Sequence, residues 1–227
     1  MEMKETKKSI LKVLEKDGKK KASKFDRMVL LLALQKIESD SFELDGEAIY
    51  TDDKHCLVYC LSQNESFVVP EGVEVIGEMA FRRKKNLKSV VLPAGLQKIS
   101  RDAFYDCDQL DNVYIPASVM DINGYSFAEC DGLRTVTFAA KPKHLSRHTF
   151  EDSDNLMRVV VPQGTSEAFK KALHYDSIDD EYLFVENKPK TEAEAPAKTA
   201  EKAPSKNKKE GKKDTKKSVK DDGQDKK

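Results

Sequence analysis

A period of 23 residues runs through the middle of this chain and restricts its fold more than any other feature. Pro70, Pro93 and Pro116 are each 23 residues apart, and two further steps lead to Ala139 and Pro162. Regular spacing of this kind is typical of a solenoid in which each repeat is one coil. The apolar positions that keep the period over four copies are Ile76, Ile99, Ile122 and Leu145; Phe81, Phe104, Phe127 and Phe150; Leu87, Leu110, Leu133 and Leu156; Val90, Val113, Val136 and Val159; and Leu92, Ile115, Phe138 and Val161.

The pattern within one period predicts a strand followed by a turn. Apolar residues alternate over residues 89–92, and the proline that follows ends the strand because it cannot donate to a ladder. Ser100, Asn123 and Ser146 share one phase and are good N-cap residues for a single helical turn that ends at the phenylalanine. Coils stacked about 4.8 Å apart place like residues in columns. These columns form the core, and each buried side chain contributes roughly 1.5–3 kcal/mol.

Both ends of the expected solenoid are closed. Residues 46–60 read as a hairpin before the first repeat, and Thr165 is expected to cap a short helix through Leu173 after the last one. Before the hairpin, the apolar spacing and a capping-box pattern predict helices over residues 4–16 and 24–38. The second helix is apolar nearly all round, so we expect it to pack against the body of the protein or against a second chain.

The charge is balanced overall, with 40 basic and 40 acidic side chains, but it is unevenly distributed. Residues 1–40 carry a net charge of +4, residues 41–185 of −9 and residues 186–227 of +5. This excludes the single-sign field that steers a nucleic-acid binder. The most apolar run, residues 28–34, is far shorter than the roughly 20 residues that span a membrane. It also lacks the small residues of a signal-peptide cleavage site, so we expect a cytoplasmic protein, with secretion or the cell surface as the alternative.

The repeat resembles the BspA-type bacterial leucine-rich repeat. Residues 46–70 resemble that family's N-terminal cap, and residues 160–171 resemble its C-terminal cap. The resemblance implies an α/β repeat solenoid of right-handed coils with one open β-sheet. It also implies binding to other macromolecules rather than catalysis, and many members of the family are secreted or lie on the cell surface. The residues that carry the resemblance are Gly72, Val73, Ile76, Ala80, Phe81, Leu87, Val90, Leu92 and Pro93 in one copy, and Ile99, Ala103, Phe104, Cys107, Leu110, Val113, Ile115 and Pro116 in the next.

We therefore expect three segments. Residues 1–40 form an N-terminal helical segment, residues 41–185 the leucine-rich repeat domain, and residues 186–227 a Lys-rich tail that is disordered because it has almost nothing to bury. The domain divides into a cap hairpin over 41–69, four 23-residue coils over 70–161 and a C-terminal cap over 162–185.

Four cysteines are the first candidates for chemistry. Cys107 and Cys130 are in phase, so they should lie on neighbouring coils, at a spacing that permits a disulfide. A buried, reduced column is the favoured interpretation in a cytoplasmic protein. Cys56 and Cys60 are too far apart in a strand to bridge each other. With His55 they make an incomplete ligand set, because zinc needs a fourth partner, and we predict no metal or other cofactor.

The turn after each phenylalanine gives a column of charge. Residues 82–85 form a basic patch that could seat a phosphate or an acidic partner. Residues 105–108, 128–131 and 151–154 form an acidic ridge, in which carboxylates on neighbouring coils could bind Ca²⁺ weakly. Solvated turns are the favoured interpretation of both features.

The solvent side of the strands is the candidate binding face, because repeat proteins usually bind through their extended faces. The alternative interpretation is that β-branched residues are simply good strand formers. The residues expected on this face are Ser66, Val68, Ser89, Val91, Asn112, Tyr114, Thr135, Thr137, Arg158 and Val160.

The sequence gives little support for catalysis. His144 and His148 share a coil but have no recognisable nucleophile motif beside them, and there is no Gly-rich phosphate loop. We therefore expect a non-enzymatic module that presents its sheet face to a protein partner, with self-association through residues 24–38 as a further hypothesis. The alternatives are an exported adhesin-like protein and a nucleic-acid-associated protein that acts through the Lys-rich tail; the acidic residues within that tail make nucleic acid the less favoured partner.

Overall fold

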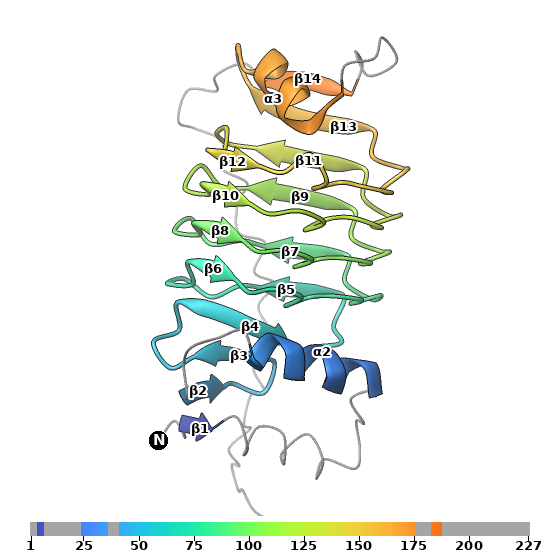
Figure 1. Ribbon diagram of the computed structural model, residues 1–227. Coiled ribbons are helices and arrows are strands. Elements are labelled where there is room, and N and C mark those ends of the chain that lie inside the picture. Colours follow the sequence, from blue (N-terminus) through green and yellow to red (C-terminus); the bar gives the residue numbers. More distant parts are fainter. Residues whose placement is uncertain (1–3, 7–23, 36–40, 176–182, 188–227) are drawn as a thin grey trace, which may run out of the picture. The chain divides into compact units, whose positions relative to one another are not determined.

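Two sheets run along the stack of coils in this computed structural model, which describes residues 4–6, 24–35, 41–175 and 183–187 (Figure 1). All of them lie in the compact unit of residues 1–190. The eight-stranded sheet has the order β1 (Lys4–Thr6), β2 (Ser41–Leu44), β3 (Ala48–Thr51), β4 (Cys56–Cys60), β6 (Val75–Ile76), β8 (Lys98–Ile99), β10 (Asp121–Ile122) and β12 (His144–Leu145). The six-stranded sheet has the order β14 (Phe184–Asn187), β13 (Arg158–Pro162), β11 (Thr135–Phe138), β9 (Asn112–Ile115), β7 (Ser89–Val91) and β5 (Ser66–Val68).

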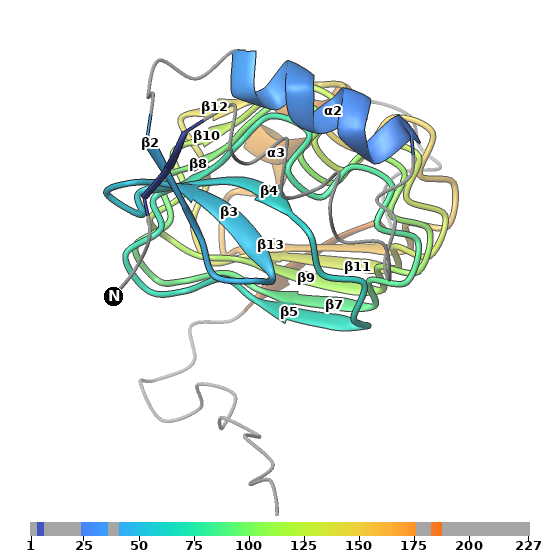
Figure 2. The ribbon, with the colours of Figure 1, turned by 90° about the horizontal axis from the view of Figure 1, so that it is seen from below.

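Each coil places one strand in each sheet, in register with the next coil. Val136 pairs with Val113 on one side and with Val159 on the other, so partners differ by one 23-residue period. Figure 2 looks along the stack and shows strands such as β8 and β10 on a different side of the coils from β7 and β9. The expectation of a single open sheet is therefore wrong. The second ladder was missed because its repeat strands are two residues long, too short to show an alternating pattern.

The turn between the two sheets is not a helical turn, which corrects another expectation. Backbone φ is positive at two positions of each inner turn, for example 55° at Asp102 and 61° at Asp106, where a right-handed helix requires negative values. Alternate N–H groups instead donate to the next coil. Phe81 donates to the Ala103 carbonyl at 2.7 Å, and Phe104 donates to the Ser126 carbonyl at 2.8 Å. The turns therefore form a third set of bonds that joins the coils.

The core consists of the predicted columns. The stacked rings of Phe81, Phe104 and Phe127 have centroids 4.7 and 4.9 Å apart, and Phe150 continues the stack at 6.0 Å. All four are buried. Stacked aromatic pairs contribute roughly 0.5–1.5 kcal/mol beyond the burial of their surface. The phenylalanine column is thus the continuous centre of the stack.

The N-terminal cap contains the predicted hairpin. β3 and β4 pair antiparallel, and β4 then pairs parallel with β6 of the first repeat. α2 (Lys24–Gln35) confirms most of the helix expected over 24–38, and residues 36–38 lie outside the described ones. Its Val29, Leu30, Ala33 and Leu34 pack with Phe42, Ile49, Val58 and Tyr59 of the cap.

The helix expected over residues 4–16 is wrong at its start. Residues 4–6 form β1, which pairs antiparallel with β2. Backbone pairing with an available sheet edge takes precedence there over the local helical spacing of Ile10, Leu11 and Leu14. Those three residues lie outside the described part of the chain.

The C-terminal cap is formed by α3 (Ser166–Leu173) and β14. Phe169 of α3 is fully buried, 4.8 Å from the ring of Phe138, and β14 extends the six-stranded sheet by pairing with β13. Thr165 precedes the helix as expected, but its hydroxyl donates to the Pro162 carbonyl at 2.7 Å and caps no helix N–H. β14 includes residues 186 and 187, the first two of the expected tail; residues 188–227 lie outside the described part.

Candidate functional site

The outer face of the six-stranded sheet carries a continuous row of side chains that we call the outer stripe. It follows one residue position from strand to strand, and adjacent members pair in register, as Val68 does with Val91 and Thr137 with Tyr114. The exposed fractions are 66% for Val68, 56% for Val91 and 55% for Tyr114, whereas the strand residues between the outward positions are buried. The members of the outer stripe are Val68, Val91, Tyr114, Thr137, Val160 and Val185.

A polar row runs beside the outer stripe, two residues earlier in each strand. The exposed Ser89 pairs with the exposed Asn112, and Thr135 pairs with Arg158. The sequence-predicted face residues are thus brought together on one sheet, in two parallel rows. The polar row consists of Ser66, Ser89, Asn112, Thr135 and Arg158.

The structure adds two features to this face that sequence reasoning missed. Val185 extends the outer stripe, but it follows Val160 by 25 residues and so falls outside the 23-residue period. A shallow hollow of about 470 Å³ borders the polar row, lined in part by Lys88, Asp111 and Arg134. Gly132 lines the same hollow, and a side chain there would meet the Asp108 carbonyl oxygen, 2.3 Å from its Cβ.

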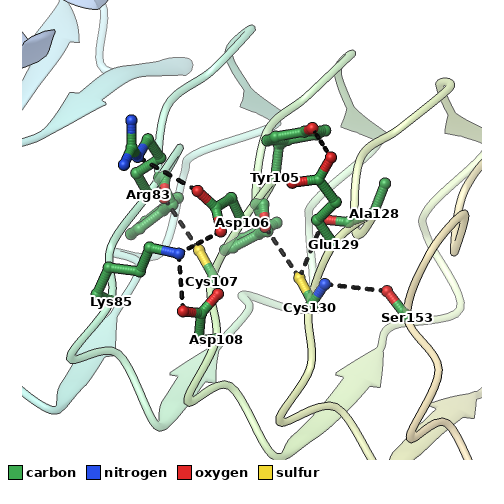
Figure 3. Close-up of polar contacts among 12 residues, drawn as sticks. Arg83, Lys85, Tyr105, Asp106, Cys107, Asp108, Ala128, Glu129, Cys130 and Ser153 are labelled. Atoms are coloured by element: carbon green, nitrogen blue, oxygen red, sulfur yellow. Dashed lines mark hydrogen bonds and ion pairs between the residues drawn. The ribbon is translucent and has the colours of Figure 1, made fainter.

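The basic turn at residues 82–85 is not a free cationic surface. Lys85 forms ion pairs with Asp106 and with Asp108, the latter at 2.7 Å, while Arg83 lies 3.2 Å from Asp106 (Figure 3). Burial opposes the charged form of Lys85, yet the hydrogen bonds that its ammonium donates to the two carboxylates raise its pKa. Burial is also the main reason that the pKa of Asp106 is raised. The first coil's basic turn is therefore matched to the acidic turn of the next coil.

The acidic ridge is tied into similar contacts between coils. The Tyr105 hydroxyl donates to Glu129, and this hydrogen bond, with partial burial, raises the pKa of Tyr105 to about 12 (Figure 3). Glu151 contacts His148, whose ring stacks on Tyr125 at a centroid distance of 5.2 Å. In the part of the chain that the structure describes, no group of three His, Cys, Asp or Glu side chains is arranged to hold a metal ion.

The cysteines of the inner coils are buried and reduced. The Cys107 thiol donates to the Phe81 carbonyl at 3.0 Å, and the Cys130 thiol donates to the Phe104 carbonyl at 3.1 Å (Figure 3). Ser153 in the next coil makes the same bond to Phe127 at 2.8 Å. Burial raises the pKa of Cys130 to about 12, so it stays a neutral thiol and a poor nucleophile at pH 7.

Among the described residues, Cys56, Cys60, His55 and His144 form no pair of a nucleophile with a neighbouring base. Burial raises the pKa of Cys56 to about 11 and that of Cys60 to about 12. His55 is exposed and lies 3.8 Å from Asp53, and His144 lies 3.9 Å from Asp121. In the described part of the chain, no helix has the length and the apolar character that a membrane span requires.

Parallel coils of near-constant length, closed by a hairpin and a helix, define a solenoid built from leucine-rich repeats. The chain belongs to the BspA type leucine rich repeat family, whose model matches residues 53–178 in six copies. The matched range begins within the hairpin and extends beyond α3, so it is longer than the four coils expected over residues 70–161. Leucine-rich repeats of this kind are typical of protein-interaction modules and are generally non-catalytic scaffolds.

The comparison with solved structures finds bacterial leucine-rich repeat proteins, and the first one named here shares the fold. A leucine-rich repeat protein from Eubacterium ventriosum is 24% identical with a TM-score of 0.50, over 54% of this chain and 33% of that one. The Treponema pallidum leucine rich repeat protein is 22% identical with a TM-score of 0.41, over 49% and 66%. A leucine rich cell surface protein from Faecalibacterium prausnitzii is 18% identical with a TM-score of 0.38, over 62% and 42%. This chain thus matches about a third of the length of the Eubacterium protein, and no curated protein matches it.

Proposed function

We propose that this protein is a non-enzymatic binding module and that the outer face of its six-stranded sheet binds a protein partner. The observation that carries the proposal is the outer stripe, where valines and a tyrosine that a solenoid core does not need stand exposed on successive strands. Contiguous exposed apolar surface marks interaction sites in soluble proteins. Each such side chain contributes up to roughly 1.5–3 kcal/mol when a partner covers it completely.

The surroundings of the outer stripe indicate what the partner offers. A polar row with hydroxyl and amide groups flanks it, and Arg158 ends that row. Arg134 lines the neighbouring hollow, and among the described residues neither arginine forms an ion pair. Apolar side chains bordered by carboxylates are therefore the surface that fits this face, with tyrosine at the centre as the anchor that interfaces favour.

The experiment compares retention of partners from the native cell by the full-length protein and by Val91→Asp with Tyr114→Asp. Both side chains point to solvent, so the double substitution costs no more than about 1 kcal/mol per site, as the β-propensity scale allows. We expect partner retention to fall at least tenfold while the thermal unfolding transition stays cooperative. Met120→Asp is the matched control, because Met120 is an exposed apolar residue outside the outer stripe.

The proposal is contradicted if the double variant retains its partners as well as the unsubstituted protein does. This holds whether or not Met120→Asp loses them. The location is part of the same proposal: the cytoplasm, with secretion or the cell surface as the alternative. Cell fractionation followed by protease treatment of intact cells distinguishes the two. The nucleic-acid alternative depends on the Lys-rich tail, of which residues 188–227 lie outside the described part of the chain.

A further inference from the structure

A second hollow, of about 540 Å³, lies on the side of the coils that carries β10 and β12, away from the outer stripe. Hydrogen-bond donors from three successive coils line it. They are Arg101 from the coil that contains β8, Asn123 and Gly124 from the next coil, which contains β10, and Lys143, His144 and Ser146 around β12. The sequence did not predict this hollow, because its lining combines several phases of the repeat: that of Lys143, that of Asn123 and Ser146, and that of Arg101 and Gly124.

The hollow exists because of one glycine. Glu78, Arg101, Gly124 and Arg147 share one phase of the period, so Gly124 interrupts a column of long charged side chains. The backbone of Gly124 is not in the left-handed region, so the absence of a side chain, not an unusual φ, distinguishes the position. A Cβ there would lie 3.2 Å from the Ser146 Oγ, which places that hydroxyl at the floor of the hollow.

Cations at this hollow are less neutralised than those of the basic turn. Arg101 has a carboxylate 3.9 Å away, on Asp102, but that carboxylate lies closer to Arg82, at 3.1 Å. The Arg101 guanidinium is held 5.0 Å above the ring of Tyr125, and its side chain is 59% exposed. Among the described residues Lys143 makes no ion pair. Among the described residues that line the hollow, Glu78 is the carboxylate and Arg101 and Lys143 are the cations, so the lining itself carries an excess of positive charge. Asp121 lies outside the lining, 3.9 Å from His144.

We propose that this hollow binds a phosphoryl group, either free phosphate or a small phosphomonoester. A phosphomonoester carries a charge of about −1.5 to −2 and three acceptor oxygens. Guanidinium, ammonium, amide and hydroxyl donors approaching from several sides fit such an anion better than they fit a planar carboxylate of single charge. The site is separate from the outer stripe and does not depend on the protein-binding function proposed above.

The test follows the Gly124 amide resonance of the full-length protein by NMR at constant ionic strength. The probes are inorganic phosphate, O-phospho-L-serine and acetate. We expect the two phosphates to shift this resonance saturably and acetate to leave it unchanged. Arg101→Gln with Lys143→Gln should weaken phosphate binding at least tenfold. Tighter binding of one phosphate than the other identifies whether the free anion or the ester is the better ligand.

Two further variants make the result decisive. Arg134→Gln removes an arginine at the other hollow that forms no ion pair with the described residues, and it should leave the affinity within twofold. Gly124→Glu fills the hollow and adds a negative charge, so it should abolish binding, with far-UV circular dichroism confirming the fold. The proposal is overturned if no saturable shift is seen, if acetate binds as well as phosphate, if Arg134→Gln weakens binding as much as the double variant, or if folded Gly124→Glu binds like the unsubstituted protein.

Discussion

Cys107, Cys130 and Ser153 occupy the same position of three successive coils, and each donates a hydrogen bond to the phenylalanine carbonyl of the preceding coil. The position therefore requires a small side chain with one donor, and sulfur itself is not essential. Lys84 takes this position in the first coil, where the neighbour is the hairpin, and its ammonium lies 5.0 Å from the ring of Tyr59. The thiols are thus structural groups whose chemistry the fold suppresses.

Substitution at Cys130 tests this interpretation. Cys130→Ser keeps a donor, as Ser153 does one coil later, and we expect the free energy of unfolding to change by less than about 1 kcal/mol. Cys130→Ala removes the donor to the Phe104 carbonyl and should cost about 1–3 kcal/mol. Urea unfolding measures both values. Equal losses in the two variants would show that the hydrogen bond contributes nothing.

Ser126 carries a polar atom that the fold leaves without a partner. Its hydroxyl is fully buried and, among the described residues, unbonded, while the same position holds Ala80 and Ala103 in the two preceding coils. Removing an unsatisfied buried hydroxyl avoids its desolvation cost, so Ser126→Ala should raise the free energy of unfolding by about 1 kcal/mol. Thermal and urea unfolding measure the change. A lower stability in Ser126→Ala would mean that the hydroxyl has a partner in solution.

Strands, turns and helices differ in how far the sequence predicts them. The strands of the six-stranded sheet are predictable because alternating apolar residues and a following proline mark them. The turns are not, since residues such as Met79 and Tyr125 adopt φ values of 60° that their side chains do not favour. Bonds to neighbouring coils compensate for this conformation, and no single coil's sequence contains that information.

Two adjacent leucines in α2 separate its packed face from its open face. Leu30 is fully buried against the hairpin, whereas Leu31 is 41% exposed. Leu30→Ala should lower the free energy of unfolding by about 2–5 kcal/mol, as large-to-small core substitutions do. Leu31→Ala is the matched control and should change it by less than about 0.5 kcal/mol. Equal effects in urea unfolding would mean either that α2 detaches from the cap or that a second chain covers Leu31.

For the whole molecule, the candidate binding face is largely predictable because the period brings like residues into rows. Spacing alone predicts that Val91 and Tyr114 lie on one face, and both are exposed on neighbouring strands of the six-stranded sheet. Features that break the period could not be predicted from it. Val185 joins the outer stripe from an out-of-phase strand, and Gly124 opens a hollow only because residues of its own coil and of neighbouring coils surround it. The basic turn at 82–85 is a case in which the sequence suggests a binding patch that the structure does not leave free. Its Arg83 and Lys85 pair with carboxylates of the next coil.

The outer stripe as a binding surface is tested most directly by a photo-crosslinking residue, benzoyl-phenylalanine, placed at Tyr114 of the full-length protein in its native cell. Covalent capture reports which surface touches the partner without requiring that the complex survive purification. We predict one discrete crosslinked product from position 114, lost when Val91→Asp is added, and none from the same residue placed at exposed Met120. A product from position 120 with none from position 114 would contradict the claim that the sheet face binds the partner.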